Sequence, residues 1–206
     1  WDAARAYYDR LVPARGASVY LVTEYARALS ERSEHVRAAT ELERVRQRLR
    51  GDTRVLGPLL RDLGRAYRDA GDVGRAIAAL EDGLRATQEG GLRRELYEVL
   101  TDTYRRAGRL PELAVSLRAD ARSEATAARA AIEDELGHED AALEAYRRVL
   151  AGNQRDVDTR LRIVQLLARA GRLAEVVDEY RALLRAVPGE PRFVVDGHLG
   201  RLAAYL

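Results

Sequence analysis

Arginine is the residue type in this sequence with the most binding chemistry to offer. The 206 residues contain 35 basic side chains, and every one of them is arginine. A guanidinium group can grip a carboxylate or a phosphate through two parallel hydrogen bonds. Codon usage in a GC-rich genome is the alternative explanation for the missing lysines. Because 33 acidic residues are interleaved with the arginines and the net charge is only +2, the pattern favours a solvated helical surface with paired charges.

The other residue types do not assemble a catalytic or metal site. His35, His138 and His198 each stand alone, and His138 is expected to be a solvated turn residue. The pair Gly90-Gly91 lacks the strand, the helix and the lysine of a phosphate-binding loop. The carboxylates at 133–135 are interpreted as a charged helical face, and no cysteine is present for a disulfide, a thiolate or a zinc site. We therefore expect no enzyme, cofactor, metal or small-molecule substrate.

The elements that must position the arginines are predicted to be helices. Hydrophobic residues make up 47% of the chain, and alanine, leucine, arginine and glutamate dominate the composition, all of which suit helices. No run of about 18 apolar residues occurs, so no membrane span is expected. The composition is compatible with the cytoplasm or the periplasm.

One segment shows how these helices are joined. Leu60, Leu63 and Tyr67 follow helical spacing, Gly71 offers a left-handed stop, and Asp72 can cap the next helix. The second helix then carries the apolar residues Ala76, Ile77, Leu80 and Leu84. The segment predicts a helical hairpin.

The same hairpin pattern recurs along the chain. The phrase Arg-Ala-Gly-Arg-Leu occurs at 106–110 and again at 169–173. Aligning the second helices gives the pairs Ala4/Tyr8, Ala38/Leu42, Ala76/Leu80, Leu113/Leu117, Ala142/Tyr146 and Val176/Tyr180. Successive pairs are 34, 38, 37, 29 and 34 residues apart, with a mean of about 34.

This pattern resembles a bacterial-type array of tetratricopeptide (TPR) repeats, and the resemblance covers nearly the whole chain. Such repeats favour small residues where their two helices approach closely and bulky ones between successive hairpins. Counted from Gly57, the matching residues are Leu60, Leu63, Gly64, Tyr67, Ala76, Leu80 and Gly83, while Gln88 departs from the usual proline. When the repeat positions are counted from residues 19, 94 and 157 instead, further residues match the TPR pattern. Among them are Tyr25, Ala26, Ala38, Tyr97, Tyr104, Ile163, Leu167, Tyr180 and Pro188.

The resemblance implies an all-α, right-handed α-solenoid of antiparallel helical hairpins. The approximate repeats are 1–18 (partial), 19–56, 57–93, 94–122, 123–156, 157–190 and 191–206 (a partial repeat or a capping helix). The repeat 123–156 is the poorest match, and the 29-residue spacing before it indicates either an irregular hairpin or missing residues.

The two ends carry apolar stripes rather than polar caps. Trp1, Ala4, Tyr8 and Leu11 lie at helical spacing, as do Val195, Leu199, Leu202 and Leu206 at the other end. We expect a segment of a longer array that self-associates end to end or frays at its N-terminus.

A TPR array implies a concave groove lined by first helices. The repeat register places Arg61, Arg65, Arg68, Asp69, Glu98, Asp102, Arg105 and Arg106 in that groove. Its five arginines suit an acidic peptide or a C-terminal carboxylate. The alternative is that Arg65–Asp69 and Asp102–Arg106 are ordinary pairs on a solvated helix.

The function that these features favour is a scaffold that binds a protein or peptide. An alternative is a regulatory TPR segment of a larger enzyme or transcription regulator. Nucleic-acid binding is less favoured, because the net charge is low and the tyrosines are interpreted as packing residues. A chaperone-type carboxylate clamp is also disfavoured, because the chain has no lysine and its one asparagine, Asn153, falls in a predicted loop.

Overall fold

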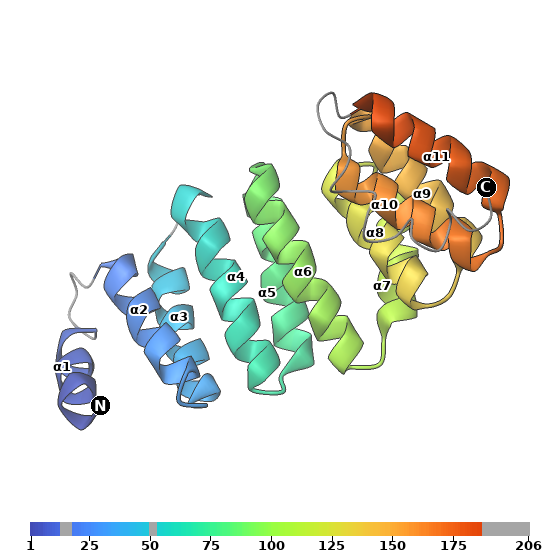
Figure 1. The fold of residues 1–206 in the computed structure, drawn as a ribbon. Coiled ribbons are helices and arrows are strands. Elements are labelled where there is room, and N and C mark those ends of the chain that lie inside the picture. The colour runs from blue at the N-terminus through green and yellow to red at the C-terminus, as the bar shows by residue number, and fades with distance from the viewer. Residues whose placement is uncertain (13–17, 50–52, 187–206) are drawn as a thin grey trace. The chain divides into compact units, whose positions relative to one another are not determined.

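The computed structural model describes residues 1–12, 18–49 and 53–186, and this part of the chain is helical throughout, with no strand (Figure 1). No helix in these ranges is both long and apolar enough to cross a membrane. The predicted stripe at 191–206 and Pro188 lie outside them. The helices are α1 (Asp2–Leu11), α2 (Val19–Ser30), α3 (His35–Arg48), α4 (Thr53–Asp69), α5 (Val73–Ala86), α6 (Gly90–Arg106), α7 (Leu110–Ser116), the short 3-10 helix η1 (Leu117–Ala119), α8 (Ser123–Glu135), α9 (Glu139–Gly152), α10 (Val157–Arg169) and α11 (Leu173–Ala186).

The turn inside each hairpin has the same backbone geometry. The first helix ends in a residue with positive φ, and these residues are Ser33, Gly71, Gly108, Gly137 and Gly171. At the second of these turns, Gly71 N–H donates to the Arg68 carbonyl at 3.0 Å and Asp72 N–H donates to the Tyr67 carbonyl at 2.8 Å. These two hydrogen bonds form a Schellman motif, which ends the helix. The predicted all-α architecture of antiparallel hairpins is therefore confirmed for the described residues.

The chain divides into two compact units, residues 1–113 and 114–206. In the first unit, α2 packs on α3, α4 on α5, and each pair packs on the next. Glycine allows the closest of these approaches, since a Cβ added at Gly64 of α4 would lie 2.5 Å from the Cγ of Leu80 in α5. The core residues around this contact are Val22, Tyr25, Leu29, Ala38, Leu42, Leu60, Leu63 and Ala76.

The second unit repeats the arrangement with α8 on α9 and α10 on α11. Its core gathers Ala130, Ala142, Tyr146, Ile163, Leu167 and Val176, with Tyr180 packed against it. Except for Ala130, these are residues that the repeat alignment expects to be small or bulky at these places.

The hairpin with the 29-residue spacing is irregular. Its second helix, α7, has only 7 residues and continues as η1, whereas α3, α5, α9 and α11 each have 14. Asp120 then ends the segment by accepting a hydrogen bond from Arg122 N–H at 3.1 Å. The shortened second helix accounts for the short spacing.

The N-terminal helix packs on the rest of the first unit through aromatic side chains and through polar contacts of Arg5 and Asp9. Tyr8 of α1 stacks on Tyr25 of α2 with ring centroids 4.7 Å apart. Trp1 also packs on the core, whereas Ala4, a member of the predicted stripe, is exposed. No residue of α1 is fully buried.

Candidate peptide-binding face

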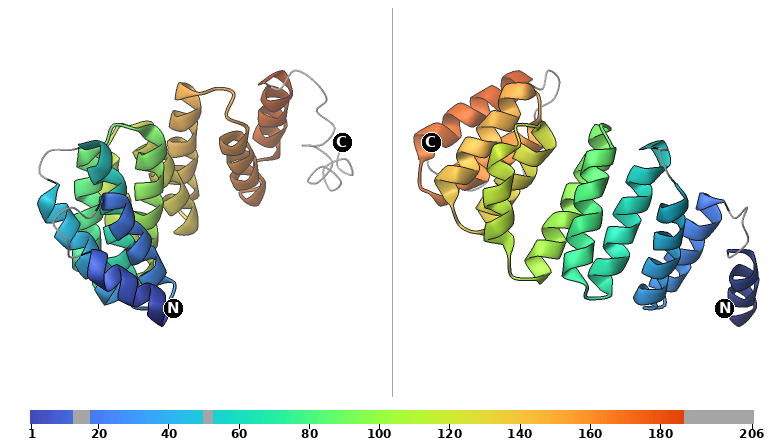
Figure 2. Two further views of the ribbon diagram at one scale, coloured as in Figure 1. Left: turned by 90° about the vertical axis from the view of Figure 1, so that its left-hand side faces the viewer. Right: turned by 180° about the vertical axis from the view of Figure 1, so that it is seen from behind.

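The eight predicted groove residues come from two neighbouring helices of the first unit. Arg61, Arg65, Arg68 and Asp69 lie on α4, and Glu98, Asp102, Arg105 and Arg106 lie on α6. The helices α2, α4 and α6 run side by side in one layer, with α3 and α5 behind them (Figures 1 and 2). We call the solvent-facing side of α2, α4 and α6 the first-helix face.

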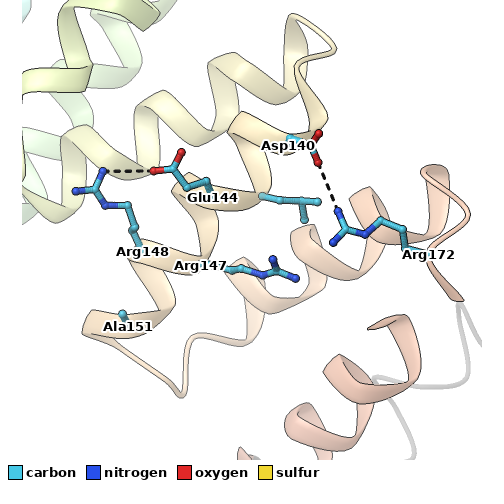
Figure 3. Close-up of a pocket in the computed structure, with 7 residues that line it drawn as sticks. Asp140, Glu144, Arg147, Arg148, Ala151 and Arg172 are labelled. Carbon is cyan, nitrogen blue, oxygen red and sulfur yellow. Dashed lines mark hydrogen bonds and ion pairs between the residues drawn. The ribbon is translucent and has the colours of Figure 1, made fainter. Parts of the chain in front are cut away.

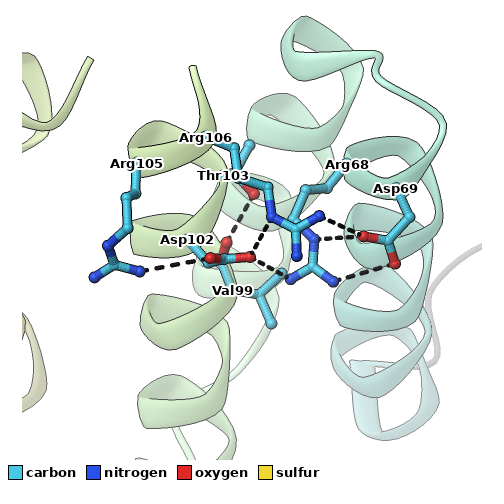
Figure 4. A network of polar contacts seen from close by, with 7 residues as sticks. All are labelled: Arg68, Asp69, Val99, Asp102, Thr103, Arg105 and Arg106. Carbon is cyan, nitrogen blue, oxygen red and sulfur yellow. Dashed lines mark hydrogen bonds and ion pairs between the residues drawn. The ribbon is translucent and has the colours of Figure 1, made fainter. Parts of the chain in front are cut away.

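Five of the predicted residues, Arg68, Asp69, Asp102, Arg105 and Arg106, form one network of alternating charge (Figure 4). The guanidinium of Arg68 makes two hydrogen bonds to Asp69, at 2.9 and 3.1 Å, and reaches Asp102 of α6 at 3.1 Å. Arg106 in turn contacts Asp69 at 3.2 Å and Asp102 at 2.9 Å. Each carboxylate therefore bridges arginines from both helices, and the network ties α4 to α6.

A second link between the same helices lies nearer their N-terminal ends. Arg61 donates to Asp62 at 2.9 Å and also forms an ion pair with Glu95 of α6. Burial acts to lower the pKa of Arg61, but the two neighbouring carboxylates outweigh it, and the net effect raises that pKa above its usual value. The guanidinium is held as a structural cation with its side chain only 19% exposed.

The exposed members of the set are Arg65, Glu98, Arg105 and Arg106. The alternative of local pairing is correct for Asp102–Arg106 and wrong for Arg65–Asp69, because Asp69 is occupied by Arg68 and Arg106. Arg65 instead lies 3.8 Å from Asp62, beyond hydrogen-bond distance, with its side chain 44% exposed. Arg105 is equally exposed and lies 3.5 Å from Asp102.

The sequence-based reading missed one exposed aromatic residue on this face. Tyr20 in the first turn of α2 is 74% exposed, so it does not pack as the tyrosines were expected to. The signal was present, since the buried residues of α2 are Val22, Tyr25, Ala26 and Leu29, and Tyr20 falls off that helical stripe. Glu95 was also missed, because its partner lies on a different repeat.

The carboxylates near His138 correct another expectation. Glu133 of α8 is 2% exposed rather than part of a solvated face. Its carboxylate lies 2.7 Å from the Nδ1 of His138 and 3.7 Å from Arg118. His138 is an exposed turn residue as expected, with its side chain 58% exposed, and it also contacts this buried carboxylate. Its ring closes the turn between α8 and α9.

A surface pocket of about 420 Å³ lies on α9 and Arg172, the residue just before α11 (Figure 3). Three arginines line it, but each is paired: Arg148 with Glu144 at 3.7 Å, and Arg172 with Asp140 at 3.5 Å. Arg147 contacts Glu175 at 2.9 Å. Within the described ranges, no group of three or more His, Asp or Glu side chains is arranged to hold a metal ion.

Comparison with known proteins places the fold. No protein-family model matches the chain, and no curated protein matches its sequence. A crystal structure of MamA is 17% identical with a TM-score of 0.50, covering 78% of this chain and 93% of that one. YrrB, described as a TPR protein with an unusual peptide-binding site, is also 17% identical with a TM-score of 0.50, covering 94% of this chain and 97% of its own.

The chain has a TPR-like fold. The likeness to YrrB extends over almost all of both chains, so it spans the helix pairs of both units. The glycine contact of Gly64 with Leu80 and the repeated positive-φ turns are the parts of this TPR-like fold that the sequence specifies most directly. They fix each first helix against its own second helix, and the packing of α2 on α4 and of α4 on α6 then forms the first-helix face.

Proposed function

We propose that the chain is a protein–protein interaction scaffold that binds a peptide or a partner protein on the first-helix face, the side expected to be concave. The observation that carries this proposal is the combination of exposed binding groups on a rigid support. Arg65 and Arg105 are exposed on α4 and α6, which Arg61 and Arg68 tie together, and the ring of Tyr20 is exposed on the neighbouring α2. Exposed aromatic and arginine side chains are the residue types enriched where proteins bind one another.

The likeness to YrrB supports the same class of partner, since that protein is described as having a peptide-binding site. For this chain we propose that the bound segment contains an acidic residue or a C-terminal carboxylate. Arg65 is the best placed to receive it, because its guanidinium makes no hydrogen bond to a carboxylate within the described residues. A carboxylate held by a guanidinium forms charge-assisted hydrogen bonds that are stronger than neutral ones.

An unbiased peptide-display library tests the proposal. Peptides selected on the purified protein are expected to lose binding to the Arg65→Glu/Arg105→Glu double variant and to keep binding to Arg181→Glu. Arg181 is a matched control because it is 65% exposed but lies on α11, in the other unit. Circular dichroism confirms that each variant is folded. Selected peptides that bind both variants as tightly as the original protein would place the site elsewhere.

A further inference from the structure

The helices α4 and α6 are joined by ion pairs that recur at a fixed interval. Arg61 pairs with Glu95 and Arg68 pairs with Asp102, and in both pairs the partners are 34 residues apart. Each pair places an arginine on α4 opposite an acid on α6. We call such a pair, an arginine of α4 opposite an acidic residue of α6, a rung. The two pairs are rungs between helices of neighbouring repeats.

The sequence supplies a further arginine and a further acid between these rungs. Arg65 follows Arg61 by one helical turn, and Glu98 follows Glu95 by nearly one turn. They therefore lie at the level where a middle rung is expected. In the described part of the chain, however, Glu98 forms no ion pair, and Arg65 reaches only Asp62 of its own helix, at 3.8 Å. Both side chains are exposed, and the middle rung is open.

The open rung offers opposite charges on two helices whose axes are separated by roughly 8–10 Å, the usual spacing of packed helices. A ligand with a single acidic residue satisfies Arg65 but brings its carboxylate close to Glu98 and Asp62. A ligand with two acidic residues is repelled by Glu98 outright. Charge complementarity therefore favours a segment of mixed charge, which satisfies both sides of the rung and suppresses like-charged competitors.

We propose that the partner is an extended segment in which an acidic and a basic side chain, two residues apart, complete this rung. Alternate residues of an extended chain point to the same side, about 6.6 Å apart. The acidic side chain pairs with Arg65 and the basic one with Glu98. This inference rests on the proposed function, and it specifies the charge pattern of the segment that the first-helix face binds.

The test compares four fluorescent peptides of equal length that share all residues except one triplet, read as Glu-Ser-Lys, Glu-Ser-Glu, Lys-Ser-Lys or Gln-Ser-Gln. The shared residues are taken from a peptide selected on the first-helix face. Fluorescence anisotropy is expected to show the Glu-Ser-Lys peptide binding at least tenfold more tightly than each of the others at low salt. Glu98→Arg should shift the preference to Glu-Ser-Glu, and Arg65→Glu should shift it to Lys-Ser-Lys.

The charge-swapped variant Arg65→Glu/Glu98→Arg provides the matched control, because it keeps the net charge of the rung. It is expected to bind the mixed peptide again when the triplet is reversed to Lys-Ser-Glu. If Glu-Ser-Glu binds the original protein as tightly as Glu-Ser-Lys, or if Glu98→Arg changes no preference, the mixed-charge inference is wrong while the groove function stands. If no library peptide depends on Arg65 and Arg105, the proposed function fails and the inference fails with it.

Discussion

Gly64 of α4 lies directly against Leu80 of α5, so closely that a Cβ at Gly64 would stand 2.5 Å from the Leu80 Cγ and 2.6 Å from its Cδ2. Rotation about χ2 moves only the Cδ atoms of a leucine, so the Cγ can retreat only by a change of χ1 or a shift of the backbone. Leu80 is fully buried, and its surroundings leave little room for it to retreat. The contact fixes how near the two helices of this hairpin approach.

We predict that Gly64→Ala destabilises the protein by on the order of 1–3 kcal/mol, because overpacking outweighs the gain in helix propensity. The matched control is Gly74→Ala in α5, where the nearest atom to an added Cβ is Asp72 Oδ1 at 4.0 Å. That variant should be neutral or more stable by up to about 1 kcal/mol. Urea unfolding followed by circular dichroism measures both. Equal effects of the two substitutions would contradict the close helix approach.

The turn at Ser33 predicts a stabilising substitution. Ser33 has a φ of 61°, while the equivalent residues of the other hairpins are the glycines at 71, 108, 137 and 171. A residue with a Cβ in this left-handed region is strained by roughly 1–2 kcal/mol, and part of that strain is regained when glycine replaces it. Ser33→Gly should therefore raise the free energy of unfolding by about 0.5–1 kcal/mol. The reciprocal change Gly171→Ser should lower it, and effects of the same sign would contradict the shared turn geometry.

The sequence predicted the hairpins well because their signals are local. Gly64, Ala76 and Leu80 specify a helix contact within one repeat, and a glycine after the first helix specifies the turn. The starts of the helices were less accurate: α4 begins at Thr53 and α6 at Gly90, each before the repeat start predicted at 57 and 94. Each early turn adds one residue to the core, Leu56 in α4 and Leu92 in α6, but the repeat register counted from 57 and 94 did not include them.

The pairing of charges on the first-helix face was not predictable in the same way. The sequence identified Asp102–Arg106, which lie on one helix, but not the contact of Arg68 with Asp102 or of Arg61 with Glu95. Those contacts depend on the distance and stagger between α4 and α6, which tertiary packing sets. The burial of Glu133 was not predicted for the same reason: its neighbour Arg118 lies in η1, a different element, so their contact depends on tertiary packing.

A buried arginine gives the next prediction. Arg93 of α6 is 2% exposed, and its guanidinium donates to the carbonyl oxygens of Leu84 at 2.8 Å and Thr87 at 3.2 Å. It also donates to the hydroxyl of Tyr97 at 3.3 Å. The side chain therefore satisfies carbonyl groups at the end of α5 that have no helical partner.

Replacing Arg93 by alanine leaves these acceptors without a donor in a buried place. We expect a loss of on the order of 3 kcal/mol in the free energy of unfolding. The neighbouring Arg94 is exposed and forms no ion pair with the described residues, so Arg94→Ala should change stability by less than about 0.5 kcal/mol. Urea midpoints that moved equally for the two variants would show that Arg93 has no capping role.

The docking of α1 is expected to depend on pH through Tyr25 and Asp9. The hydroxyl of Tyr25 donates to the carboxylate of Asp9, which also contacts Arg37. Burial, with Asp9 adding to it, raises the pKa of Tyr25 to about 12. The hydrogen bond from Tyr25 lowers the pKa of Asp9 below 3.8, against the opposing effect of burial and with the help of Arg37.

The two shifts have opposite consequences. Because the pKa of Tyr25 is higher in the folded chain than the 10.0 expected when unfolded, its contribution is complete below pH 10 and is lost as the pH rises towards about 12. That loss should be on the order of 1–2 kcal/mol. Asp9 contributes above its ordinary pKa of 3.8, and its contribution is lost as the pH falls through its lower folded value.

Free energies of unfolding measured across this range should fall less between pH 10 and 12 in Tyr25→Phe, and less below pH 4 in Asp9→Asn, than in the original protein. Tyr104, Tyr146 and Tyr180 are buried or partly buried, and desolvation raises their pKa values too. They titrate in all three proteins, so the difference between the curves reports on Tyr25 alone. Parallel alkaline curves for Tyr25→Phe and the original protein would show that the Tyr25 hydroxyl does not couple α1 to the first unit.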